Sequence, residues 1–137
     1  MELYHLDWQR SFAKDEARHA QLILGFGIAD SEGLKELYRD ALLEGLFDHV
    51  ADIDGDDLDY GYMATNNETI SASWSRTPAE GVFPVAPTFH LGEDGRKYGR
   101  RSTSIGDLVL VDGRFQAVAS MGFRDVGPDP RPALAPA

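Results

Sequence analysis

Six carboxylates recur at four-residue intervals in the first half of the chain: Glu32, Glu36, Asp40, Glu44, Asp48 and Asp52. On an α-helix this spacing places them in one row, roughly 6 Å apart along the axis. Such a row is similar to the phosphates along a nucleic-acid strand. It would attract the basic groove of a nucleic-acid-binding protein, and the attraction would weaken with salt.

Acidic residues are concentrated around this row. Residues 30–59 hold eleven acidic and two basic residues, in a chain whose net charge is −10. Like charges four residues apart destabilise a helix, here by about 1 to 2 kcal/mol in all before screening. We therefore expect a partner-binding surface made by the six carboxylates together with Asp54 and Asp56. A solvated face, with Lys35 and Arg39 easing the repulsion, is the alternative.

The aspartates that follow the row could also hold a cation. Asp52, Asp54 and Asp56 match the first, third and fifth positions of an EF-hand loop. The match then fails, because Asp57 occupies the sixth position, where the glycine belongs, with Gly55 two positions early, and Met63 occupies the twelfth position, where a glutamate belongs. A solvated acidic turn and a weak surface site for Ca²⁺ or Mg²⁺ remain the two interpretations, and we expect no resident metal or cofactor.

Other reactive residues do not form a catalytic pattern. The histidines are dispersed, although His49 could join a base or metal site beside the aspartates, or complement a helix dipole. No nucleophile elbow surrounds Ser102–Ser104, and Asp30 replaces the third glycine of a dinucleotide loop that would begin at Gly25. We therefore expect a protein that is not an enzyme.

Four basic residues surround Tyr98: Arg96, Lys97, Arg100 and Arg101. Such a patch can hold a phosphate, or a base stacked on the ring, but it can also keep the approach to a hairpin soluble. The net charge of −10 opposes nucleic-acid binding by the whole molecule. We expect a protein partner with a basic surface and no direct nucleic-acid binding.

Length and composition predict one domain with a sizeable core. The sequence has no cysteine, which excludes disulfides, thiolate metal sites and thiol catalysis and fits a reducing compartment. No apolar run approaches the roughly 18 residues of a membrane span, and the first ten residues lack signal-peptide features. We expect a cytoplasmic protein without membrane contact, comprising a domain over 1–126 and a proline-rich, disordered tail over 127–137.

The segment 98–123 organises the predicted fold. Asp112-Gly113 separates two apolar runs, as in a two-residue hairpin that pairs Val111 with Arg114 and Leu108 with Ala117. Period-two alternation then predicts a buried face and a partly solvated face. The buried face holds Leu108, Leu110, Phe115, Ala117 and Ala119. The solvated face holds Asp107, Val109, Val111, Arg114, Gln116 and Val118.

The remaining elements are predicted to cover this hairpin. We expect strands over 2–8 and 21–29, a polar connection or short helix over 9–20, and a principal helix over 32–50. A shorter helix is expected over about 57–66 with an aspartate cap, followed by weak alternation over 69–74 and a short edge strand within 82–90. Trp8 and Trp74 are expected in the core.

A set of short motifs carries a resemblance to a known family. They are Asp57-Leu58, Met63 to Asn67, Trp74, Arg101-Ser-Thr-Ser-Ile-Gly-Asp107, Gly113 and Gly122-Phe123. Residues 57–123 thereby resemble the YodL-like domain of small plasmid and phage proteins. The resemblance implies a mobile-element protein and carries over no catalytic residues.

These observations predict an α+β fold. A small antiparallel sheet centred on the C-terminal hairpin would pack against one long acidic helix and a shorter helix. The function we expect is inhibition of a host nucleic-acid-binding defence complex, of the restriction or CRISPR kind, by acidic mimicry of DNA. The alternative is a protein-interaction module that binds through the sheet face of Val109, Val111 and Val118.

Overall fold

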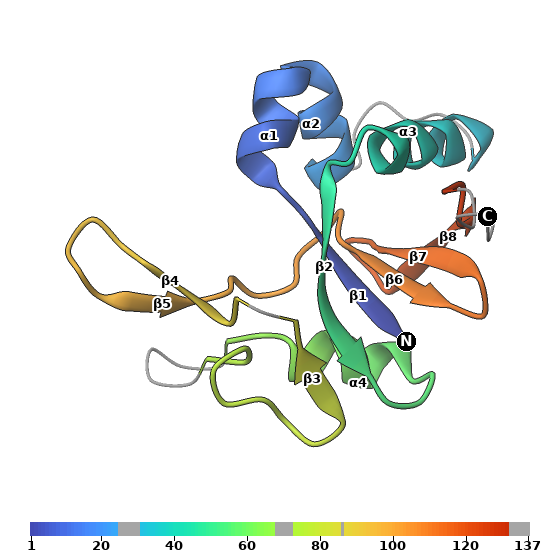
Figure 1. The fold of residues 1–137 in the computed structure, drawn as a ribbon. Helices are drawn as coiled ribbons and strands as arrows, with labels where there is room; N and C mark the ends of the chain where they lie inside the picture. The colour runs from blue at the N-terminus through green and yellow to red at the C-terminus, as the bar shows by residue number, and fades with distance from the viewer. Residues whose placement is uncertain (25–30, 68–72, 86, 132–137) are drawn as a thin grey trace, which may run out of the picture.

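The fold is a six-stranded sheet with helices on both faces, as the computed structural model shows for residues 1–24, 31–67, 73–85 and 87–131 (Figure 1). In chain order the elements are β1 (Glu2–Leu6), α1 (Trp8–Lys14), α2 (Glu16–Leu24), α3 (Ser31–Leu43), β2 (Phe47–Ile53), α4 (Leu58–Ala64), β3 (Val82–Pro84), β4 (Phe89–Leu91), β5 (Lys97–Gly99), β6 (Leu108–Val111), β7 (Arg114–Val118) and β8 (Phe123–Pro128).

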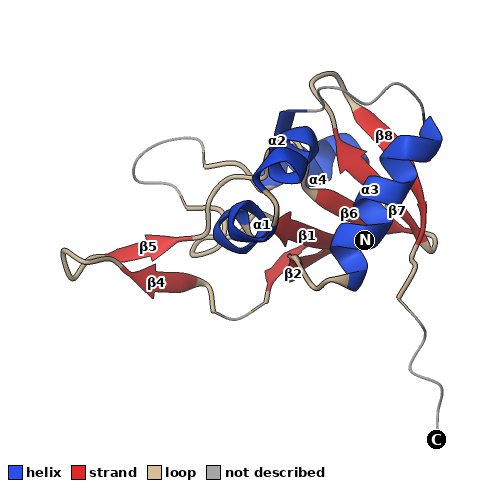
Figure 2. Ribbon diagram, turned by 90° about the horizontal axis from the view of Figure 1, so that it is seen from above, coloured by secondary structure: helices blue, strands red, loops and turns tan. Residues whose placement is uncertain are grey.

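The strands of the main sheet follow the order β3-β2-β1-β6-β7-β8, and every neighbouring pair is antiparallel. Strands β4 and β5 form a separate hairpin that projects from the sheet as an arm (Figures 1 and 2). The predicted α+β class is therefore confirmed, with β6 and β7 inside the sheet. Among the described residues, no helix combines the length and apolar character that a membrane crossing requires.

The central hairpin has the predicted register, with Val111 opposite Arg114 and Leu108 opposite Ala117. Asp112 and Gly113 have φ angles of 51° and 76°, as a tight turn with two left-handed residues requires. Asp112-Gly113 supplies this conformation at low cost, because glycine and aspartate tolerate positive φ better than most residues.

Other elements pack against both faces of the sheet. On one face Leu108, Phe115 and Ala117 pack with residues of α2 and α3. On the other face Val109 packs with Trp74 and α4, and Asp107 and Val118 are also buried. Val111 and Gln116 are half-buried and Arg114 is exposed, so the predicted partly solvated surface is present only near the β6–β7 turn. Alternation tells which residues share a face, but not that a distant segment covers it. Of the three valines named for the alternative binding face, Val109 and Val118 are buried and Val111 is half-buried.

The principal helix is shorter than predicted. Helix α3 ends at Leu43, and residues 47–53 form β2 instead of two further turns. Leu46 N donates to Ala41 O, Gly45 N donates to Leu42 O, and Gly45 has a φ of 73°. This pattern is a Schellman motif with glycine at the C′ position, which ends a helix.

Other expectations are corrected in the first quarter of the chain. Residues 16–24, partly assigned to a strand from the sequence, form α2, and residues 25–30 lie outside the described part. Of the two alternatives for residues 9–20, the short helix is the one that forms: α1 is capped by Asp7, whose side chain accepts from Arg10 N. Trp8, at the start of α1, is 43 % exposed and is not a core residue.

The later elements are closer to expectation. Helix α4 has Asp57 as its N-cap, accepting from Tyr60 N, and β3 is an edge strand. The buried Trp74 donates from its indole to Arg101 O. Residues 127 and 128, which were predicted to belong to the tail, are part of β8, and Asp129 N donates to Gly113 O. Residues 132–137 and 68–72 lie outside the described part.

Candidate partner-binding groove and the Glu2–His49–Asp52 cluster

The end of α3 at Leu43 divides the eight predicted partner-binding carboxylates among three places. Helix α3 itself carries Glu32, Glu36 and Asp40. Lys35 lies 3.6 Å from Glu32, and Arg39 lies 3.3 Å from Asp40. The row on the helix is therefore half its predicted length, with cations beside it, and it no longer resembles an extended line of phosphates.

Glu44 and Asp48 face helices α1 and α2. Glu44 forms ion pairs with Arg18 and, at 3.8 Å, with Lys14. Asp48 accepts from Arg10 Nη2 at 2.6 Å, and the same guanidinium binds Asp7. These two carboxylates connect the residues at the start of β2 to helices α1 and α2. Their charges are compensated by the arginines and the lysine of those helices.

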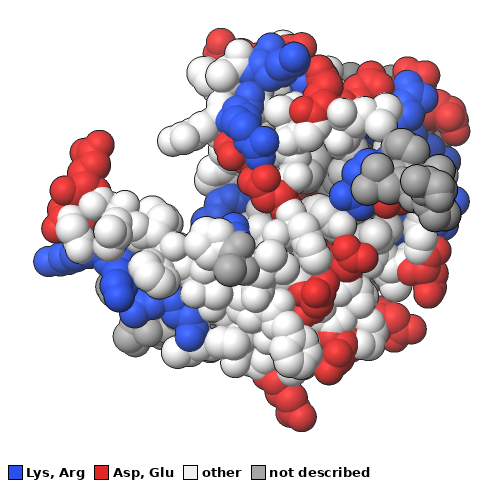
Figure 3. Space-filling model, in the orientation of Figure 1, with Lys and Arg blue, Asp and Glu red and all other residues white. Residues whose placement is uncertain are grey.

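The other three carboxylates, Asp52, Asp54 and Asp56, lie at an acidic groove. The groove has a volume of about 500 Å³ and lies where β1 begins, β2 ends and the β6–β7 turn closes. Glu2 and Asp112 bring its carboxylates to five. No lysine or arginine lines it in the described part of the chain, and its one cation there is the Met1 ammonium, which donates to Ile53 O at 2.7 Å and to Gly55 O at 3.4 Å. Figure 3 shows acidic side chains over this end of the sheet.

Antiparallel pairing explains why distant acidic residues meet here. Glu2 lies opposite Asp52 in β2 and opposite Leu110 in β6, so β1 brings both strand ends together. Beyond β2, Gly55 has a φ of 82° and turns the chain, and Asp57 caps α4. The aspartates therefore follow a strand end and a turn and do not encircle one point, so no EF-hand loop forms.

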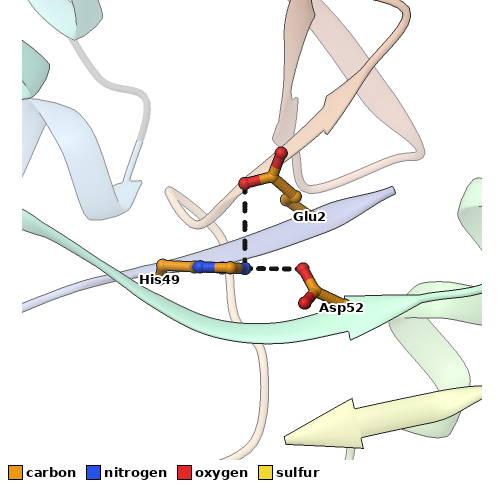
Figure 4. Close-up of side chains that lie close together, drawn as sticks. All are labelled: Glu2, His49 and Asp52. Atoms are coloured by element: carbon orange, nitrogen blue, oxygen red, sulfur yellow. Dashed lines mark hydrogen bonds and ion pairs between the residues drawn. The ribbon is translucent and has the colours of Figure 1, made fainter. Parts of the chain in front are cut away.

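A histidine stands beside the groove and faces two of its carboxylates (Figure 4). His49 Nε2 lies 2.8 Å from Asp52 Oδ1 and 3.8 Å from Glu2 Oε1. One ligand atom from each of the three residues lies within 4.8 Å of the other two. Carboxylate oxygens and an imidazole nitrogen are ligands that Zn²⁺ and Mn²⁺ accept in proteins.

A bulge in β2 makes this cluster possible. Residues three apart in a regular strand point to opposite faces, so His49 and Asp52 would not meet. The register shifts between Leu3, opposite Ala51, and Tyr4, opposite His49, which leaves Val50 as the extra residue. Bulges of this kind redirect side chains and occur near functional sites.

Tyr4 and Arg131 hold the residues of the Glu2–His49–Asp52 cluster in position. The Tyr4 hydroxyl donates to Glu2 Oε1 at 2.8 Å, and its ring stacks on His49 with centroids 5.1 Å apart. Arg131 Nη2 donates to the Tyr4 hydroxyl at 3.1 Å while Asp129 holds the same guanidinium. Burial raises the pKa of Tyr4, so its hydroxyl stays protonated and able to donate.

Sequence reasoning identified Asp52, Asp54, Asp56 and the ambiguous role of His49, but missed Glu2 and Asp112. The acidic turn was visible as a run of like residues. Glu2 and Asp112 join it only through the pairing of β1 with β2 and β6, which no local pattern encodes.

No family model, curated protein or solved structure matches this chain. The resemblance of residues 57–123 to the YodL-like domain therefore stays a prediction.

Proposed function

We propose that this protein binds a basic surface of a partner protein through the acidic groove of Glu2, Asp52, Asp54, Asp56 and Asp112. The observation that carries the proposal is the gathering of five carboxylates around one groove without a lysine or arginine among its described lining residues. Elsewhere on the molecule most acidic side chains predicted to bind a partner already face a cation, as Glu44 and Asp48 do.

The groove favours a cationic partner for electrostatic reasons. Carboxylates that share a cleft reinforce one another's potential, and a basic surface would relieve their repulsion as it binds. Asp52, Asp54 and Asp56 are exposed, so they remain accessible to a large partner. In this proposal the protein acts by binding and not by catalysis.

The biological setting of the proposal comes from the sequence. The resemblance to proteins of plasmids and phages is the ground on which we propose that the chain is an accessory protein of a mobile element. Its partner would then be a cytoplasmic host defence complex of the restriction or CRISPR kind, whose nucleic-acid channel is basic. The acidic groove would occupy part of that channel in place of DNA.

A pair of charge-matched variants tests the groove. The groove variant carries Asp52→Lys, Asp54→Lys and Asp56→Lys, and the helix variant carries Glu32→Lys, Glu36→Lys and Asp40→Lys. Partners would be captured from host lysate, identified, purified and titrated with each protein in the presence of duplex DNA. We expect the groove variant to lose at least tenfold in affinity, the helix variant to bind normally, and DNA to compete.

If the helix variant lost affinity and the groove variant bound normally, the binding site would lie on α3. A partner that DNA does not displace would refute the mimicry. Circular dichroism of each variant checks that the fold survives.

The Glu2–His49–Asp52 cluster supports a second candidate function, which is binding of a divalent metal ion. The specific support for this candidate is His49, because binding of a basic surface would require only carboxylates. The β2 bulge turns this histidine toward both Glu2 and Asp52. Calorimetric titration with Zn²⁺ and Mn²⁺ tests it. His49→Ala should abolish the heat of binding and Asp56→Asn should leave it unchanged; equal binding by both variants would remove this candidate.

A further inference from the structure

A second hollow lies on the other side of β2, between the start of α1 and the base of the β4–β5 arm. Its volume is about 280 Å³, close to the lower end of the range for small-molecule sites. Figure 3 shows the surface hollowed between the arm and the part of the molecule above it, with basic side chains there and along the arm. Among the lining residues are Trp8, His90, Arg100 and Arg101.

Cations without a carboxylate partner gather at this hollow and the adjoining arm. Nine of the thirteen lysines and arginines lie within 4.0 Å of a carboxylate oxygen. Across the described residues, the four that have no such neighbour are Arg76, Lys97, Arg100 and Arg124. Arg76 Nη1 donates to Lys97 O at 3.4 Å, and Arg100 directly follows β5, so three of the four lie together.

Arg100 has the strongest need for an anion. Its side chain is half-buried, and its Nε is enclosed with no hydrogen-bond partner among the described residues. Nη2 donates to Val85 O at a long 3.3 Å. Burial lowers the pKa of this guanidinium. Burying a cation without a counterion costs free energy, and a bound anion would recover it.

Flat rings stand beside this cation. Trp8 is 43 % exposed, although the Arg101 guanidinium covers part of its ring at 4.1 Å from the centroid. His90 lines the hollow and stacks on Tyr98, with ring centroids 5.8 Å apart. A base can stack on such rings while a neighbouring arginine holds its phosphate.

The arm holds Tyr98 in a fixed position. The Tyr98 hydroxyl donates to Asp94 Oδ2 at 2.5 Å. A Cβ at Gly92 would lie 2.4 Å from Tyr98 Cε2, so the ring occupies the space that glycine leaves free. The ring stack therefore belongs to an ordered hairpin and not to a freely rotating side chain.

Two carboxylates, Asp7 and Asp48, also line the hollow. Both are occupied by Arg10, whose Nε lies 2.9 Å from Asp7 and whose Nη2 lies 2.6 Å from Asp48. Asp48 also attracts the Arg100 guanidinium and raises its pKa, which opposes the effect of burial. Among the described residues no carboxylate oxygen lies within 4.0 Å of that guanidinium, so Arg100 has no ion-pair partner of its own.

We propose that this hollow binds a nucleotide, with its phosphate on Arg100 and its base against Trp8 or the His90–Tyr98 stack. The nucleotide can be free or part of a single strand, since both present the same phosphate and base. This proposal is independent of the acidic groove. It replaces the expectation of no nucleic-acid binding, which rested on the net charge and took no account of how the charges are distributed.

Tryptophan fluorescence tests the proposal with the full chain in 20 mM salt. The probes are AMP, UMP, inorganic phosphate and a twelve-residue oligo(dT). We expect a nucleotide to quench Trp8 and to bind at least tenfold more tightly than phosphate. Arg100→Ala should lose at least tenfold in affinity, whereas the charge-matched Arg114→Ala, whose arginine pairs with Asp125, should bind normally. Trp8→Leu should abolish the quenching while its circular dichroism remains that of the wild type.

Tighter binding of the oligonucleotide than of AMP and UMP would assign the site to single-stranded nucleic acid, and equal or weaker binding would assign it to free nucleotides. Both results support the proposal. Absence of binding at millimolar nucleotide, or equal weakening by Arg100→Ala and Arg114→Ala, would overturn it.

Discussion

A fully buried carboxylate, Asp107, joins the loop before β6 to β1 and has no exposed surface. Arg101 donates to it from Nη1 at 2.6 Å and from Nη2 at 2.8 Å, and Leu6 N and Ser104 N donate as well. The segment 101–107, which is the longest motif of the family resemblance, is therefore a structural turn around a buried charge.

Removing the Asp107 carboxylate should destabilise the protein strongly. Asp107→Ala leaves the Arg101 charge and two backbone N–H groups without their acceptor, which costs about 3 to 5 kcal/mol for a buried pair. Urea denaturation measures the loss. As a control, Asp125→Ala breaks the exposed pair with Arg114 and should cost less than about 1 kcal/mol. Equal losses would show that Asp107 contributes no more than a surface charge.

His5 makes stability depend on pH. Its Nε2 lies 2.8 Å from Thr103 Oγ1, and burial lowers its pKa to about 4, while the nearby Asp107 acts in the opposite direction. The unfolded chain gains a proton near pH 6.5 and the folded chain does not, so stability is complete above pH 6.5. It declines as the pH falls toward 4, by on the order of 3 kcal/mol.

The control for this pH dependence is a matched pair of variants. His5→Gln should flatten the dependence between pH 6.5 and 4, measured as the urea midpoint at each pH. His90→Gln, which replaces an exposed histidine, should keep the slope of the wild type. A wild-type slope in the His5 variant would assign the effect to other groups, such as His19, whose pKa burial also lowers, or the carboxylates.

At the level of elements, the hairpin and the capped helix α4 were predictable because their signals are local. Asp112-Gly113 specifies its own turn, and Asp57 caps its own helix. Gly45 is a sequence signal for the end of α3. The four-residue spacing of carboxylates across 32–52 favoured a longer helix, and the prediction followed that spacing. Charge spacing does not measure helix length, because carboxylates on a strand or turn can keep the same interval.

The groove was less predictable because it depends on pairing between distant segments. The β1–β2 register and its bulge bring His49 and Asp52 to Glu2. Likewise, the cover that α4 and Trp74 give to Val109 comes from packing, so no alternation pattern could reveal it.

Gly106 shows how one residue permits two elements to pack. It has a φ of +94°, and a Cβ there would lie 2.5 Å from Leu22 O in α2. Gly106→Ala should therefore suffer both backbone strain and a backbone clash, for a loss of about 3 kcal/mol or more. Thermal unfolding of Gly113→Ala provides the comparison.

Gly113 also has a positive φ, of +76°, but a Cβ there meets nothing within 4 Å. Its substitution should cost about 1 to 2 kcal/mol, from the strain alone. Equal losses at the two glycines would mean that α2 yields to the new methyl group without cost.

Over the whole molecule, charge is segregated although the net value is −10. Strand β2 links the two regions, since Asp48 lines the basic hollow and Asp52 lines the acidic groove. Four residues of strand separate them by roughly 13 Å. That distance exceeds the Debye length of about 8 Å at physiological ionic strength but is well below the roughly 30 Å at 0.01 M salt.

This separation predicts how the two surfaces influence each other. At 150 mM salt the groove variant Asp52→Lys, Asp54→Lys, Asp56→Lys should bind a nucleotide with wild-type affinity, within about twofold, because its six units of charge change are screened. At 10 mM salt the same variant should bind severalfold more tightly, because the field of the groove then reaches the hollow. Fluorescence titration of AMP at both salt concentrations measures this, with the helix variant Glu32→Lys, Glu36→Lys, Asp40→Lys as the control for net charge. A large change at 150 mM in the groove variant alone would mean that the two surfaces form one site, because only a ligand in contact with the groove could sense its charges through that salt.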